Sequence, residues 1–130
     1  MSNEASNLLS PRSRWLEAHR DLEASRNEFK IAKAKYKQAV EARDEASRIL
    51  EAASQRLQRL RNEKRQLGAR NSKRRALVRA VGDARERQKT LKRKYKSARA
   101  KAKIASREFR SARAAKNHAR YELELASAGF

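Results

Sequence analysis

Large apolar residues recur at seven-residue intervals along the first half of the chain. Counting from Trp15, Leu22, Phe29, Tyr36, Leu50 and Leu57 share one phase, and Arg43 and Lys64 occupy its two other places. A second series, three residues later, is mostly Ala and ends at Leu60 and Leu67. A 3.5-residue repeat held over eight heptads is typical of the a and d positions of a coiled coil. The pattern therefore predicts one long helix over residues 10–67, and Pro11 suits its first turn.

The pattern stops at residues 68–71 and resumes in a second segment. Gly68 is a favourable helix C-cap, and Asn71 or Ser72 can cap a new helix. The second segment carries two series four residues apart, which run from Leu77 to Ala126 and from Val81 to Phe130. They predict a helix over residues 72–127, in which Gly82 is a weak point rather than a boundary. Residues 1–9 are expected to form a flexible tail.

The two predicted helices complement each other when the chain folds back at residues 68–71. Residues whose numbers sum to about 141 then face each other, so that Phe29 meets Ala112 and Tyr36 meets Ala105. Large side chains against small ones keep a two-helix seam, meaning the a and d positions, well packed. We therefore expect an all-α fold in which two long helices form an antiparallel coiled-coil hairpin, a single domain over 10–130. The alternative is one uninterrupted helix that dimerises through the same seam, because one Gly costs only about 1 kcal/mol.

Four polar residues interrupt the predicted seam: Arg43, Lys64, Gln88 and Lys116. Such residues can fix the register at a cost in stability, and their long stems can lie along the seam while the polar group reaches water. A two-helix hairpin has little core for its length. We expect modest stability, or packing against a partner or a second copy.

Composition excludes several classes of protein. The chain has no Cys, which excludes disulfides and thiolate metal sites, and its apolar runs are far too short to span a membrane. The only histidines, His19 and His118, are expected to be solvated, and there is no Gly-rich phosphate loop. A two-helix hairpin also offers no concave pocket in which a carboxylate could be activated. We therefore expect no enzyme activity, metal, cofactor or small-molecule substrate. No secretory signal is evident, and the expected location is the cytoplasm or nucleoid, or a virion.

Charge is the most informative feature. The chain has 35 Lys and Arg against 15 Asp and Glu, a net charge of +20. Residues 56–79 contain ten of these cations and only Glu63, and residues 85–107 contain eleven and only Glu86. Lys73, Arg74 and Arg75 occupy the predicted first turn of the second helix, where cations oppose the helix dipole. A cationic helix start that breaks this rule is a candidate phosphate site.

The sequence thus predicts a non-enzymatic protein that binds the backbone of RNA or DNA without strong sequence specificity, through the hairpin tip and second helix. Binding should weaken steeply with salt. The candidate contacts are Arg65, Arg70, Lys73, Arg74, Arg75, Arg79, Lys92, Arg93, Lys96, Arg99, Lys101 and Lys103.

A structural or assembly coiled coil is the alternative, for example a phage virion or scaffold component. In that case outer alanines such as Ala24, Ala34, Ala42 and Ala52 would pack on other subunits. Binding to an anionic membrane surface would require a bulky apolar helix face, which the pattern does not show. In shape and charge the predicted hairpin resembles the tRNA-contacting arm of bacterial seryl-tRNA synthetases, although no motif matches and no residue role follows.

Overall fold

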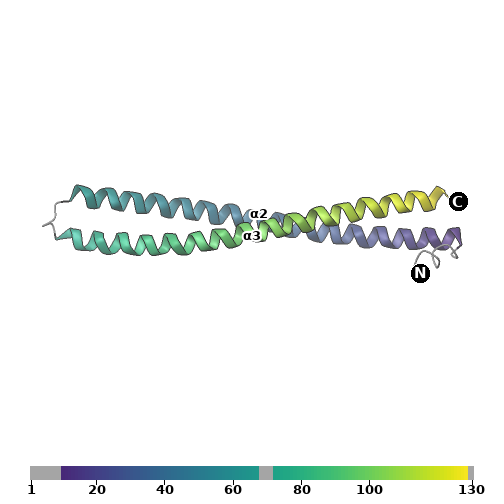
Figure 1. Cartoon of the computed structure of the whole chain (residues 1–130), viewed down its shortest axis with the longest axis horizontal. Coiled ribbons are helices and arrows are strands. Elements are labelled where there is room, and N and C mark those ends of the chain that lie inside the picture. The colour runs from purple at the N-terminus through teal and green to yellow at the C-terminus, as the bar shows by residue number, and fades with distance from the viewer. Residues whose placement is uncertain (1–9, 68–71, 129–130) are drawn as a thin grey trace. The chain divides into compact units, whose positions relative to one another are not determined.

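The computed structural model describes residues 10–67 and 72–128. They form two helices of 56 residues each, α2 (Pro11–Gln66) and α3 (Lys73–Ala128), and the described residues contain no strand. The two helices pack side by side in opposite directions (Figure 1), which confirms the all-α helical hairpin. The predicted tail 1–9, the predicted loop 68–71 with Gly68 and Asn71, and Phe130 lie outside the described residues.

The start of α2 follows directly from its first residues. The Ser13 amide donates to the Ser10 hydroxyl at 3.2 Å, and the Arg14 amide donates to the Ser10 carbonyl at 3.0 Å. Ser10 is therefore the N-cap, and Pro11 occupies the first helical position, where its missing amide proton costs nothing. At the other end, Lys64 and Arg65 lie in the last turn and complement the negative end of the helix dipole.

The helices divide into two units by their contacts. Unit 1 combines α2 up to Lys37 with α3 from Ile104 onward, and unit 2 combines α2 from Gln38 with α3 up to Lys103. Each unit is a pair of antiparallel helical segments. Within unit 1, for example, the purple part of α2 lies along the yellow-green part of α3 (Figure 1).

The predicted seam is buried in both units. Every described a and d residue of the two heptad series is buried or half-buried. The nine most buried residues all belong to it: Ala18, Leu22, Ala32, Leu57, Val81, Leu91, Ala102, Ala105 and Ala119. Leu57 in unit 2 is the most enclosed, with 1% of its surface exposed. Because the core is one narrow seam and five of these nine residues are Ala, each unit buries little apolar volume.

Three of the four polar seam residues have partners at the seam or its edge. Gln88 Nε2 donates to Ser54 Oγ across unit 2 at 3.0 Å, and Arg43 reaches out to Asp44 at 3.1 Å. In unit 1 the Lys116 ammonium lies 3.9 Å from the centroid of the Phe29 ring, which is cation–π geometry. The aliphatic stems thus remain in the seam while the polar ends are satisfied.

The aromatic residues of unit 1 also contact one another, which the pairing of large with small side chains did not predict. Phe109 lies 5.3 Å from Phe29 and 5.4 Å from Tyr36, measured between ring centroids. The register explains this, because the expected partner of Phe109 is the buried Ala32, which lies between Phe29 and Tyr36 in sequence. A large side chain that packs over a small residue can contact the aromatic rings on either side of that residue.

Gly82 does not interrupt α3. The helix continues through this position, and a Cβ added there would meet no atom within 4 Å. Its lack of a side chain is therefore not required by packing.

Candidate nucleic-acid interface

The heptad positions beside the seam fall on two opposite faces of each unit. Two grooves in each unit are lined only by c, d and g residues, contributed by both helices. The c and g positions therefore share one side, which we call the groove face. The b and e positions flank the seam on the other side, which we call the basic face.

The basic face of unit 2 has a large excess of positive charge. Its carboxylates are Asp44 and Glu51, and Asp44 is already paired with Arg43. Its nine cations are Arg61, Arg65, Arg75, Arg85, Lys89, Lys92, Lys96, Arg99 and Lys103. This face therefore has a net charge of +7.

Six of these cations form a continuous row along α3, which we call the cationic stripe. It consists of Arg85, Lys89, Lys92, Lys96, Arg99 and Lys103, which occupy six successive e and b positions and are all exposed. At 1.5 Å per residue the stripe is about 27 Å long. Among the described residues, only Lys89 of the stripe has a carboxylate within ion-pair distance, Glu86 at 3.4 Å. The remaining cations are available to an external anion.

The structure sorts the predicted contact residues onto different surfaces. Arg79 and Arg93 point outward at f positions, whereas Lys73 and Lys101 lie on the groove face. Arg70 lies outside the described residues. The basic face collects Arg65, Arg75, Lys92, Lys96, Arg99 and Lys103, to which the structure adds three residues that the sequence analysis missed: Arg61, Arg85 and Lys89. Extending the heptad count from the seam to the b and e positions would have found them.

Arg74 has a structural bond that the sequence analysis did not anticipate. It is half-buried, and its Nη1 donates to the carbonyl of Leu67, just beyond the end of α2, at 3.2 Å. A cation near the C-terminal end of one helix offsets part of the cost of a cation at the start of the next. The bond from Arg74 to Leu67 therefore offsets part of the unfavourable charge in the first turn of α3. The cationic stripe, which has no such structural role, is the stronger candidate for phosphate contact.

Unit 1 separates its charges by face. Its basic face contains two carboxylates, Glu23 and Glu124, and eight cations: Arg12, Arg26, Lys30, Lys33, Lys37, Arg110, Arg113 and Arg120. Its groove face contains two cations, Arg14 and Lys35, and five carboxylates: Glu17, Asp21, Glu28, Glu108 and Glu122. The two faces therefore differ in sign, +6 against −3, a contrast that the net charge of the unit does not reveal.

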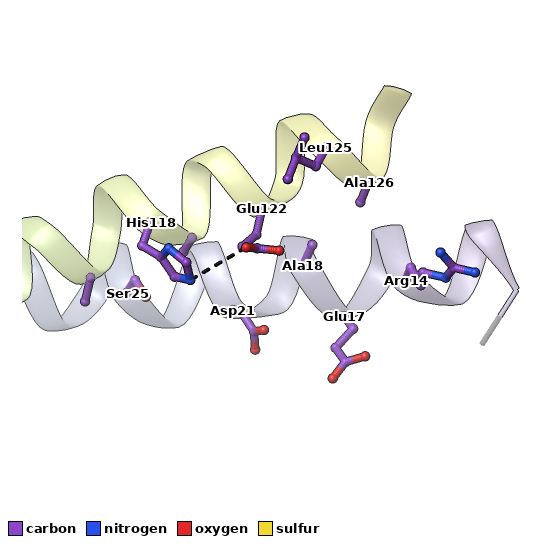
Figure 2. A pocket seen from close by; sticks show the side chains of 11 residues that line it. Arg14, Glu17, Ala18, Asp21, Ser25, His118, Glu122, Leu125 and Ala126 are labelled. Atoms are coloured by element: carbon purple, nitrogen blue, oxygen red, sulfur yellow. Dashed lines mark ion pairs between the residues drawn. The ribbon is translucent and has the colours of Figure 1, made fainter. Parts of the chain in front are cut away.

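Both histidines lie beside a carboxylate one turn along the helix. His19 Nδ1 is 3.8 Å from Glu23 and the ring stacks on Trp15, whereas His118 Nε2 is 3.7 Å from Glu122 (Figure 2). The side chain of His19 is 44% exposed and that of His118 is 73% exposed, so both imidazoles reach solvent. Among the described residues no three His, Cys, Asp or Glu side chains are grouped to hold a metal ion.

The described helices also lack any stretch that combines the length and hydropathy needed to cross a bilayer. Comparison with known proteins yields no match to a family model, a curated protein or a solved structure.

Proposed function

We propose that this protein is a non-enzymatic nucleic-acid-binding protein that contacts the phosphate backbone through the basic face of unit 2. The observation that supports the proposal is the cationic stripe of α3, six exposed cations in succession with a single ion pair among them. A helix that needs charge only for solubility does not require its cations to be aligned. Alignment does favour binding to a polyanion, because each neutralised phosphate releases a counterion.

Backbone contact rather than base recognition follows from the kinds of residue present. Lys and Arg bind phosphate oxygens irrespective of sequence. Stacking on single-stranded bases would require exposed aromatic rings. In unit 2 the aromatic residue is Tyr95, which is half-buried in the seam. RNA and DNA are therefore both accepted ligands in this proposal.

The stripe sets the expected salt dependence. Six phosphate contacts give a slope of log affinity against log salt of about −5.4 for duplex DNA and about −4.2 for a single strand. A rise from 50 to 200 mM salt should then lower duplex affinity by roughly 2,000-fold.

The test compares two variants that lose the same charge from opposite faces of unit 2. The stripe variant changes Lys92, Lys96, Arg99 and Lys103 to Gln. The matched control changes Arg56, Arg59, Arg87 and Lys94 to Gln, all exposed c or g residues of the groove face. Gln is a good helix former and none of the eight residues lies in the seam, so both variants should keep their helical circular dichroism.

Fluorescence anisotropy with a labelled duplex over a salt series gives the two slopes. We expect the stripe variant to lose about 3.6 units of slope, so that the same salt rise costs it only roughly tenfold in affinity, while the control loses less than about one unit. Equal slopes for the two variants would show that binding is diffuse. Absence of wild-type affinity at low salt would refute the proposal and favour an assembly role.

A further inference from the structure

The groove face of unit 1 is shaped to receive an elongated partner. One groove, of about 620 Å³, lies between residues 14–25 of α2 and 115–126 of α3, and a second, of about 360 Å³, adjoins it at Ala115. The buried alanines Ala18, Ala32 and Ala119 form part of the floor, and small side chains there keep the grooves open.

The rims of these grooves expose apolar side chains beside carboxylates. Ile31 is 57% exposed and Leu125 is 52% exposed. Glu17 and Asp21 project from α2 on the side away from α3 in this view, and Glu122, which is paired with His118, extends from α3 (Figure 2). An apolar floor and rim beside carboxylates suits a partner with long basic side chains, because Lys and Arg can lay their aliphatic stems on apolar surface and place the charge against an acid.

We infer that the groove face of unit 1 binds the cationic stripe of a second copy of the same chain. Charge complementarity favours this occupant, since the groove face has a net charge of −3 and the basic face of unit 2, the more positive of the two basic faces, has +7. Two groove faces would repel each other, which excludes a symmetric contact through this surface. The dimensions also agree, because the two grooves together extend over residues 14–35 of α2, about 32 Å, and the stripe is about 27 Å long.

Such a contact is heterologous, because it joins two different surfaces of the same molecule. A bound pair still offers one unoccupied groove face, on one copy, and one unoccupied stripe, on the other, so the association continues unless the geometry closes a ring. Since nucleic acid would occupy the same stripe, it should compete with self-association; this consequence alone rests on the proposed function.

The test is sedimentation velocity of the full chain over a concentration series at physiological salt, without nucleic acid. Wild type should form oligomers that grow with concentration. The groove variant Glu17→Gln, Asp21→Asn, Glu122→Gln should associate roughly tenfold more weakly, as expected for losing three exposed ion pairs. A control with the same net charge, in which Glu23, Glu41 and Glu124 become Gln outside the groove face, should associate like wild type.

A mixing experiment identifies the second surface. The groove variant retains its stripe, and the variant with Lys92, Lys96, Arg99 and Lys103 changed to Gln retains its groove face. Each should be largely monomeric alone, and a 1:1 mixture should form heterodimers that do not grow further.

Three results would overturn the inference: a monomeric wild type at every concentration, a groove variant that associates as well as its control, or a mixture without heterodimers. None of these results bears on nucleic-acid binding, which is measured separately. If wild type is monomeric at every concentration, the occupant of the groove face must be a partner other than a second copy.

Discussion

Replacing Leu57 by Ala gives the most direct test of the packing in unit 2. Leu57 is the most enclosed large side chain, with 1% of its surface exposed. Burying a Leu fully contributes about 1.5–3 kcal/mol, and Leu→Ala changes in cores typically cost about 2–5 kcal/mol when a cavity remains. A seam between only two helices can collapse or admit water, so the cavity contribution should be small and the loss about 2–3 kcal/mol.

The matched control is Ile49→Ala, on the same helix of the same unit. Ile49 is 41% exposed, and Ala is the better helix former, so the net cost should stay below about 1 kcal/mol. With a urea slope of about 1 kcal/mol/M, expected for a small protein, Leu57→Ala should lower the unfolding midpoint by about 2–3 M relative to wild type.

Urea titration followed by circular dichroism at 222 nm measures both midpoints. Residue-level hydrogen exchange shows whether the loss of protection is concentrated in unit 2. Equal midpoint shifts for the two variants, or a shift below about 0.5 M for Leu57→Ala, would show that the seam does not lie where the burial places it.

Two further predictions concern single positions in the helices. Ala105→Leu adds volume at a seam residue that is only 8% exposed and should cost about 1–3 kcal/mol in a urea titration, whereas Ala114→Leu at an exposed position should be nearly neutral; the reverse order would place the seam on the wrong face. Gly82→Ala should raise stability by about 0.5–1 kcal/mol, because the position is helical and a new Cβ meets nothing within 4 Å; a lower thermal midpoint would contradict this.

The sequence alone determined which residues form the core. Trp15, Leu57, Leu91 and Phe109 were placed in the seam by their seven-residue spacing, and the structure buries or half-buries every described residue of both series. This succeeded because the side of a helix on which a residue lies depends only on local helix geometry, and because a long heptad repeat admits few other arrangements.

Only the packed pair of helices decided how side chains from different segments meet. Arg74 was predicted to contact phosphate from the first turn of the second helix, yet its guanidinium donates to the Leu67 carbonyl near the end of the other helix. The predicted register places Phe109 opposite Ala32. Its ring also lies against Phe29 and Tyr36, because a large side chain extends beyond the residue directly opposite it.

The candidate interface depended on both the sequence and the packing of the two helices. The sequence contained the charges, and a linear count of Lys and Arg located the runs at 56–79 and 85–107 but not the side on which they lie. Antiparallel packing places the b and e residues of one helix beside those of the other, so that scattered cations such as Arg61 and Arg85 share one face. The same packing gathers Glu17, Asp21 and Glu122 around one groove. The cationic stripe lies on α3 alone and follows from its heptad positions, whereas the complete basic face and the grooves exist only after two distant segments have been brought together.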